Sequence, residues 1–426
     1  MASPNALNLY WQSTAPGSAT VPLTGETSAD VVIVGGGYTG LSSALHLAER
    51  GLKPLVLEAH DLAHGCSGRN GGQVNPGLKV PPDQLEADHG SDLGQRMFAL
   101  SQGAPDEVFD LIERLEIGCS PVRSGTLRAA INLPSQKGEE DLFRQLSLRG
   151  IPVERLEAVE MVRRTATRHY VSGLFDPRGG HINPLAYARG IAAAALRAGA
   201  RIHAFSPAQT IERQGVNWKV RTPTGTVTAP HAILCTNGYT DNLWPGLRRT
   251  IIPVMSAIVA TDPLPPALLA DIMPSRSSVY EIGWNTVYYR VDHQGRLLMG
   301  GRSSGKTSGE ERTGHLVSHA ERLWPSLKGV AWPWRWSGQV ALTTDHYPHL
   351  TEPEAGLHLM LGYNGRGVAM ATLMGRLLAE RIATGATQPF PMPVDIGLHP
   401  IPFHGLHRFG VAARIFYGRL RDAFSV

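Results

Sequence analysis

An uninterrupted apolar run opens the most informative part of the chain. Residues 30–34 read Asp-Val-Val-Ile-Val, and this β-branched run predicts a strand that is buried on both faces of a parallel sheet. Leucine and alanine then recur at helical spacing over residues 41–48, which predicts a helix that ends near Gly51. A second apolar run, at residues 54–57, predicts another strand. The pattern therefore predicts a strand–helix–strand unit near the N-terminus.

The rest of the pattern predicts further helices and strands, and a change of texture in the second half of the chain. Helices are expected over 83–117, 140–165, 184–196 and 368–384, and strands over 170–175, 201–205, 231–234 and 357–362, with a hairpin around 223–225. Proline clusters, aromatic residues and short alternating strands fill residues 245–335, which predicts an antiparallel sheet in a second domain. A chain of 426 residues is long enough for two domains.

Residues 1–29 show no apolar period, so we expect a surface arm or a loose end. Tyr10 and Trp11 within it are expected to cover a hydrophobic patch rather than to anchor the arm in a groove. The last residues, 412–424, alternate arginine with apolar residues. We expect this tail to dock on its own domain, and contact with a membrane surface is the alternative.

Gly35, Gly37 and Gly40 follow the first strand in the spacing G-x-G-x-x-G, and Glu58 follows the second strand. The first glycine permits a tight turn, the second lets backbone N–H groups approach a pyrophosphate, and the third brings helix and strand together. An acidic residue at the end of the second strand accepts hydrogen bonds from an adenosine ribose. Because strand, glycines, helix, strand and acid occur in order, the sequence predicts a site for an ADP-containing dinucleotide.

Two more glycine-rich segments extend this site. Residues 63–73 are too rich in small residues for a helix or sheet core, and we expect this loop to press against a planar or anionic ligand, with Arg69 near phosphate and Asn70 and Gln73 near a ring system. A later turn at 363–367 leads into a helix and supplies a second helix N-terminus. Two such ends predict a cofactor longer than NAD.

Composition and charge exclude several classes of protein. Hydrophobic residues at 42% and charged residues at 18% are typical of a globular enzyme. The four arginines and one aspartate after residue 405 account for +3 of the formal net charge of +4, which leaves no basic face of the kind that nucleic-acid binders show. Three cysteines without a C-x-x-C pair predict neither a disulfide framework nor a metal site, and favour the cytoplasm. The sequence shows no secretory signal pattern and no apolar run of 18 residues, so we do not expect a secreted or membrane-spanning protein.

With these motifs, the sequence resembles the FAD-dependent amine and amino-acid oxidases of the D-amino-acid oxidase superfamily. The resemblance covers nearly the whole chain in the γ-glutamylputrescine oxidases of that family, from the Tyr/Trp arm to the terminal helix at 417–422. It implies an α/β fold, in which a glutathione-reductase-type Rossmann FAD domain is joined to a substrate domain with a mixed or antiparallel sheet. The implied ranges are 30–82, 173–240 and 336–386 for the discontinuous FAD domain, 83–172 and 241–335 for the substrate domain, 1–29 for an N-terminal arm and 387–426 for a C-terminal extension.

The resemblance also implies which residues hold the cofactor. The expected FAD-binding residues are Gly35, Gly37, Tyr38, Thr39, Gly40, Glu58, Ala59, Ser67, Gly68, Arg69, Asn70, Gly71, Gly72, Gln73, Ala208, Thr236, Asn237, Gly362, Asn364, Gly365, Arg366, Gly367 and Val368. Relatives that bind FAD covalently use a histidine in the first loop or a late cysteine. This chain has Arg69 at the former place and no cysteine after Cys235, so the FAD is expected to be non-covalent. Arg366 stands where γ-glutamylputrescine enzymes often carry histidine.

The implied activity is oxidation of a C–N bond in an amine or amino-acid-like substrate, with hydride transfer to flavin N5, hydrolysis of the imine and reduction of dioxygen to peroxide. Substrate contacts are expected from Tyr289, Arg290, Arg302, His181 and Gln73, with Arg290 at the carboxylate-binding position of several relatives. A surface-satisfied role for Tyr289 or Arg290 stays open, and no general base is assigned. Two alternatives remain: a dehydrogenase of secondary, pipecolate-like amino acids that passes electrons to a quinone, and a flavoprotein that acts on nucleic acid.

Overall fold

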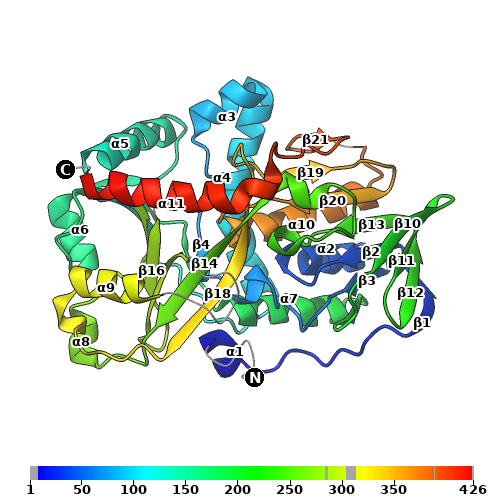
Figure 1. The fold of residues 1–426 in the computed structure, drawn as a ribbon, viewed down its shortest axis with the longest axis horizontal. Helices are drawn as coiled ribbons and strands as arrows, with labels where there is room; N and C mark the ends of the chain where they lie inside the picture. The colour runs from blue at the N-terminus through cyan, green and yellow to red at the C-terminus, as the bar shows by residue number, and fades with distance from the viewer. Residues whose placement is uncertain (1–7, 284–285, 304–312, 388, 425–426) are drawn as a thin grey trace.

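The computed structural model describes residues 8–283, 286–303, 313–387 and 389–424. Figure 1 shows the chain in two halves, each built on a large sheet, with α11 lying across one of them. The α/β fold class expected from the sequence is confirmed. No described helix has both the length and the apolar character needed to cross a membrane.

The first half is a seven-stranded sheet with the order β21-β19-β20-β13-β2-β3-β9. Its strands are β2 (Val31–Val34), β3 (Pro54–Leu57), β9 (Arg201–His203), β13 (His231–Leu234), β19 (His349–Thr351), β20 (Leu357–Leu361) and β21 (Val394–Asp395). The five strands from β20 to β9 are parallel, and β19 runs antiparallel to β20. Residues 31–34 and 54–57 are buried throughout, as their apolar runs predict. Sequence segments that are far apart therefore share one sheet.

Three helices form a layer beside this sheet: α2 (Tyr38–Glu49), α7 (Pro184–Arg197) and α10 (Gly367–Ala383). Small residues allow α2 and α10 to approach closely, since a Cβ at Gly375 would lie 2.6 Å from the carbonyl oxygen of Thr39. Ser42 Oγ also donates to the carbonyl of Thr372 at 2.7 Å. Asn183 caps α7 by accepting from the amide of Ala186, as predicted. This packing brings the N-terminal ends of α2 and α10 into one region.

A four-stranded sheet with the order β1-β12-β11-β10 lies next to the first sheet. It contains β1 (Gly25–Ser28), β10 (Thr210–Gln214), β11 (Asn217–Arg221) and β12 (Gly225–Ala229). The N-terminal arm is thus more ordered than its composition suggests, because it supplies β1 and a short helix, α1 (Leu9–Ser13). Tyr10 is buried, and its ring meets Trp336 edge-on at 5.2 Å.

The second half is an eight-stranded sheet with the order β18-β14-β17-β16-β15-β5-β7-β6. Its strands are β5 (Thr126–Ala130), β6 (Glu154–Glu157), β7 (Ser172–Asp176), β14 (Ile252–Ala260), β15 (Ser278–Ile282), β16 (Val287–Val291), β17 (Leu297–Arg302) and β18 (Trp334–Leu342). Neighbours are antiparallel except β15 and β5, so the sheet is mixed. Strands β7 and β18 belong to this sheet, whereas the expected limits at 173 and 336 cut both of them.

The remaining elements surround the two halves. They are α3 (Pro82–His89), α4 (Ser91–Arg114), α5 (Leu133–Leu148), α6 (Ala158–Thr165), α8 (Pro266–Ala270), α9 (Gly314–Leu323), α11 (His407–Phe424), and the short pair β4 (Gln73–Val74) and β8 (Gly180–His181). The helical segment expected over 83–117 is divided at Gly90, which has φ +77°. Helices α5 and α6 flank β6 within the region expected to hold short helices.

Candidate active site

A cavity of about 450 Å³ lies where the two halves meet. Fifteen of the residues expected at the cofactor or substrate line it: Gly37, Tyr38, Thr39, Ser67, Arg69, Asn70, Gly71, Gln73, Asn237, Arg302, Asn364, Gly365, Arg366, Gly367 and Val368. The others do not line it: Gly35, Gly40, Glu58, Ala59, Gly68, Gly72, His181, Ala208, Thr236, Tyr289, Arg290 and Gly362. The structure therefore brings the three glycine-rich segments together around one space.

The first glycine turn requires glycine because of its backbone conformation and because of a close backbone approach. Gly35 has φ +117°, a conformation that other residues rarely adopt. A Cβ at Gly40 would lie 2.0 Å from the carbonyl oxygen of Gly35, so a larger residue cannot occupy that position without moving the turn. Both glycines support the turn from behind, and Gly37, the N-cap residue of α2, faces the cavity.

Glu58 sits behind the same turn. Its Oε2 accepts from the amide of Gly36 at 2.7 Å, and its Oε1 accepts from the amide of His60 at 3.0 Å. Burial raises the pKa of Glu58, although the backbone amides around it act in the opposite sense. The carbonyl of Glu58 accepts from the amide of Ser206, so the segment that contains Ala208 runs alongside. An acid at this position is placed to meet hydroxyl groups at the end of the glycine turn.

The loop at 66–73 is held by its own polar side chains. Tyr38 donates from its hydroxyl to the carbonyl of Ser67 at 2.8 Å. The Asn70 amide donates to that hydroxyl at 3.1 Å, and its oxygen accepts from the amide of Gly72 at 2.7 Å. Arg69 donates from Nε to the carbonyl of His64 at 2.6 Å. These side chains therefore shape the cavity wall by fixing the loop.

The last glycine-rich turn is tied directly to the first. Thr39 Oγ1 and the Tyr363 hydroxyl are 2.5 Å apart, and Asn237 Oδ1 accepts from the amide of Gly362 at 3.0 Å. Asn364 has φ +52°, and its amide donates to the carbonyl of Gly362 at 2.6 Å. The three segments thus form one hydrogen-bonded frame.

Two helix N-termini open into the cavity, that of α2 at Gly37 and that of α10 at Arg366. Neither N-cap residue uses a side chain to bond the first turn of its helix. At α2, the amide of Tyr38 donates to Ser67 Oγ at 3.1 Å, so a loop side chain meets the first N–H group of that helix. The positive ends of both helix dipoles still lie at the cavity. A long ligand with a negatively charged middle and an electron-rich end fits this arrangement.

Comparison with known proteins agrees with this geometry. The family model described as DAO, FAD dependent oxidoreductase, matches residues 30–381. The chain belongs to this family of FAD-dependent oxidoreductases. It is 33% identical over 408 residues to γ-glutamylputrescine oxidoreductase of Escherichia coli (strain K12), covering 94% of each chain. It is 26% identical to glycine oxidase of Geobacillus kaustophilus over 386 residues, covering 86% of this chain and 97% of the relative. The crystal structure of glycine oxidase from Geobacillus kaustophilus superimposes with a TM-score of 0.72 at 21% identity, covering 87% of this chain and 99% of that one.

The residues present fit FAD. The glycine turn lacks the Cβ atoms that would fill it, the N-terminal ends of α2 and α10 lie at the cavity, and Glu58 follows the second strand. Glu58, Gly37, Gly365 and the loop at 66–73 would hold the cofactor.

The eight-stranded sheet supplies the other wall of the cavity, which Arg302 lines as expected and Tyr289 and Arg290 do not. The side chain of Tyr289 lies on the face of the sheet that is turned away from the cavity, where its hydroxyl forms a hydrogen bond with that of Tyr170 at 2.5 Å. Arg290 is 3% exposed and donates to the carbonyls of Gly71 and Ile182, the hydroxyl of Tyr10 and Nδ1 of His181. His181 is buried as well, and burial together with the charge of Arg290 holds its pKa well below the usual range. These three side chains support the wall from behind.

Five residues that the sequence did not lead us to expect also line the cavity: Tyr288, Ser256, Tyr280, Lys79 and Arg128. One signal was present, because Val287, Tyr289 and Val291 alternate and so define the core face of their strand. That period places Tyr288 on the cavity face.

Charge is unevenly distributed in the cavity. Removal of water, followed by the charges of Arg302, Arg366 and Arg414, lowers the pKa of Lys79 to about 8. Burial acts to raise the pKa of Tyr280, but the charges of Arg366 and Arg128 outweigh it and lower that pKa. The cavity therefore presents a positive field on its sheet side.

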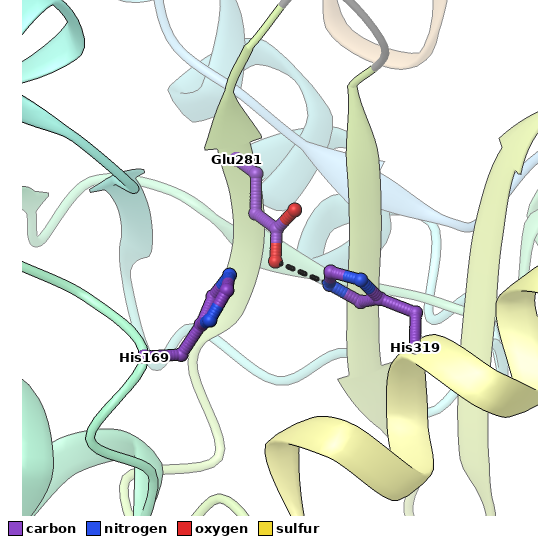
Figure 2. A group of neighbouring side chains, drawn as sticks. All are labelled: His169, Glu281 and His319. Atoms are coloured by element: carbon purple, nitrogen blue, oxygen red, sulfur yellow. Dashed lines mark hydrogen bonds and ion pairs between the residues drawn. The ribbon is translucent and has the colours of Figure 1, made fainter. Parts of the chain in front are cut away.

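A further group of titratable residues lies on the opposite face of the eight-stranded sheet. Figure 2 shows Glu281 between His169 and His319, with the three ligand atoms within 4.8 Å of one another. Glu281 Oε1 accepts from His319 Nε2 at 2.7 Å and from the Tyr170 hydroxyl at 2.9 Å, while Arg322 donates to His319 Nδ1 at 2.8 Å. With Nδ1 accepting, the proton of His319 is on Nε2, so no lone pair of that ring is free for a metal. The sequence expectation of no metal site stays a prediction.

Proposed function

We propose that the protein is an FAD-dependent oxidase of a C–N bond in an amine or amino-acid-like substrate, and that a γ-glutamylputrescine-type amine is the first substrate to test. The observation that carries the proposal is the joint cavity, which is lined by the N-terminal ends of two helices and by Tyr288, Tyr280 and Arg302 of the eight-stranded sheet. Identity of 33% to the Escherichia coli γ-glutamylputrescine oxidoreductase along 94% of both chains supports the choice of substrate.

In this reaction FAD, when bound, supplies the hydride acceptor at flavin N5 and returns the two electrons to dioxygen as peroxide. The substrate carbon loses a hydride and the nitrogen loses a proton, which leaves an imine. Water then converts the imine to a carbonyl compound and an amine.

The cavity favours the neutral form of the reacting amine. Lys79, Arg128, Arg302 and Arg366 all line it. A positive field lowers the pKa of a bound ammonium group, so the amine loses its proton on binding and its lone pair becomes available. Burial raises the pKa of Tyr288, whose neutral hydroxyl lies in the cavity 3.0 Å from Ser256 Oγ. The protein then needs no dedicated general base.

We expect the FAD to be held without a covalent bond. Cys66 is the cysteine of the first loop that lines the cavity, and burial raises its pKa to about 11. A thiol of this kind is a poor nucleophile at neutral pH. All three cysteines are free, which favours a reaction in the cytoplasm.

One observation favours a second function, a dehydrogenase that passes electrons to a membrane quinone. Ile396, Phe403, Leu406 and Phe409 are each more than half exposed, and Arg408 lies among them in the chain. An exposed apolar group with a neighbouring cation suits the surface of an anionic membrane. Sedimentation with vesicles of phosphatidylglycerol and phosphatidylcholine tests the contact, and a variant with Phe403 and Phe409 changed to serine is the control.

Product analysis under air tests the proposed function. The purified holoenzyme is incubated with γ-glutamylputrescine, pipecolate, sarcosine and a D-amino acid, and peroxide and carbonyl product are measured. We expect both products in equal amounts from one or more of these substrates. Carbonyl product that forms only when a dye or quinone is added identifies a dehydrogenase. No product from any of them under either condition contradicts the proposal.

A further inference from the structure

A second cavity, of about 280 Å³, adjoins the first one. It lies among residues of α3, α4, α5, β5 and β7. Four residues line both cavities: Lys79, Arg128, Tyr280 and Arg366. These four residues form a wall shared by the two cavities, and we call it the shared wall.

Strand pairing and hydrogen bonds hold the residues of the shared wall in place. Tyr280 and Arg128 are register partners on the parallel strands β15 and β5, so they lie side by side on one face of the sheet. Arg366 donates from its guanidinium to the Tyr280 hydroxyl at 3.0 Å, and its central carbon lies 5.1 Å from the centre of the Tyr280 ring. Arg366 also donates to the carbonyl of Pro76 at 3.4 Å, which links the wall to the segment that carries Lys79.

Within the described part of the chain, Lys79, Arg128 and Arg366 form no ion pair with a carboxylate. The Nε atom of Arg128 is buried and lacks a hydrogen-bond partner there. Neighbouring arginines in a partly dehydrated cavity repel one another, and a buried donor without a partner is costly. A bound anion would reduce this repulsion and supply a hydrogen-bond acceptor, so the shared wall favours anion binding.

Three acidic residues near the shared wall are already engaged. A fourth, Glu139, is buried and accepts a hydrogen bond from Ser172 Oγ; burial raises the pKa of Glu139, although the charges of Arg155 and Arg128 act in the opposite sense. Glu281 lines the first cavity, but its carboxylate turns to the far face of the sheet, toward His319 (Figure 2). Asp176 and Asp141 line the second cavity, where Asp176 pairs with Arg178 and Asp141 with Arg144. The positive charge of the shared wall is thus not neutralised by these three acids.

We infer that the shared wall binds a carboxylate of the substrate that is remote from the C–N bond to be oxidised. This inference rests on the proposed function and specifies its substrate class: an amine whose distal end carries a carboxylate, with the chain joining the two ends lying in the first cavity. Arginine and lysine recognise a carboxylate by charge-assisted hydrogen bonds, and the Tyr280 hydroxyl adds a neutral donor. The same field repels an ammonium group, so it selects which end of such a substrate reaches the wall.

Two oxidisable probes isolate the carboxylate: N-glutarylputrescine, which carries one, and N-butanoylputrescine, which does not. The holoenzyme and its Arg128→Met and Lys79→Met variants are compared, with Arg163→Met as the matched control because Arg163 is 73% exposed on α6. We expect Arg128→Met to reduce kcat/KM for the glutaryl probe about 30-fold more than kcat/KM for the butanoyl probe, with the difference mainly in KM. FAD content is expected to be unchanged. Equal losses for both probes, no loss for either, or loss of FAD from the variants overturns the inference.

A binding measurement separates this inference from the proposed function. N-butylglutaramate has the carboxylate but no amine, and its binding to the holoenzyme is followed by calorimetry. If the holoenzyme binds this probe and Arg128→Met abolishes the binding, the carboxylate site is supported. If no amine is oxidised in that case, only the proposed function is rejected. Amine oxidation together with binding of this probe that does not depend on Arg128 overturns the carboxylate site and leaves the proposed function standing.

Discussion

Gly300 and Tyr288 are register partners across the β16–β17 ladder, and a Cβ at Gly300 would lie 2.2 Å from the Tyr288 ring. A Cβ at Gly71 would lie 2.9 Å from the same ring. The ring therefore packs against two glycines, one on the sheet and one on the loop at 66–73. Its hydroxyl is thereby fixed within the cavity, next to Ser256.

Gly300→Ala is expected to displace Tyr288 and to destabilise the protein by about 1–3 kcal/mol, because the added methyl overlaps the ring. Tyr288→Ala should relieve that overlap, so Gly300→Ala should cost much less stability in the Tyr288→Ala background. Chemical denaturation of the four proteins of this cycle measures the coupling. If the two changes in unfolding free energy are additive, the absence of a side chain at Gly300 is not what accommodates the Tyr288 ring.

Gly40→Ala is expected to abolish FAD retention or folding, since its Cβ would lie 2.0 Å from the carbonyl oxygen of Gly35. Gly103→Ala is the matched control, because Gly103 lies in α4 and nothing lies within 4 Å of its Cβ position. That change should stabilise the protein by about 0.5–1 kcal/mol through helix propensity. Flavin absorbance per protein and the thermal midpoint report both effects. A yellow, stable Gly40→Ala protein would contradict the assigned role of the first turn.

Arg290→Met is expected to lower stability and FAD retention rather than substrate affinity. Arg290 joins the carbonyls of Gly71 and Ile182 to Tyr10, and its removal leaves these buried acceptors without a donor. We expect a loss of about 2–4 kcal/mol in unfolding free energy, with KM changed less than about 3-fold in the FAD-loaded fraction. Arg335→Met, on the exposed part of β18, is the control. A large rise in KM at unchanged stability would restore Arg290 as a substrate ligand.

Anion binding at the shared wall should weaken as pH rises through the pKa of Lys79, which the surroundings lower to about 8. Burial lowers this pKa most, the charges of Arg302, Arg366 and Arg414 lower it further, and Tyr280 raises it. Lys79 is charged below that pH and neutral above it, and binding of an anion favours the charged form. The Kd of N-butylglutaramate is therefore expected to rise about 3- to 10-fold between pH 7 and pH 9.5.

The probe itself has no group that titrates in that range, so the change reports the protein. Lys79→Met should bind more weakly at pH 7 and should lose this pH dependence. An unchanged pH profile in Lys79→Met would assign the titration to another group.

The nucleotide-binding half could be predicted because its signals are local. Residues 31–34 and 54–57 are buried runs, and the glycines between them are required by contacts that lie within the same unit. The N-cap role of Asn183 was equally local and is confirmed. Such positions depend on neighbours in sequence, so one sequence is enough to find them.

The cavity wall on the eight-stranded sheet could not be predicted in the same way. Arg128 and Tyr280 meet because β5 pairs with β15 in parallel, across more than a hundred residues of chain. Nothing local marks Arg128 as a cavity residue. Arg290 was expected at the substrate, but the loop at 66–73 covers it, and that covering is a tertiary contact. Strand period alone would have placed Tyr289 in the core and Tyr288 at the cavity.

Anaerobic single-turnover spectroscopy asks whether one cavity holds FAD beside an amine. The holoenzyme is mixed with γ-glutamylputrescine in the absence of oxygen, and absorbance of the flavin near 450 nm is followed. We expect the yellow colour to be lost in a reaction that saturates with substrate, and to return on admission of air with one equivalent of peroxide. A protein that contains no flavin, or whose flavin keeps its colour with this amine and with every other amine and amino acid tested, would contradict this expectation.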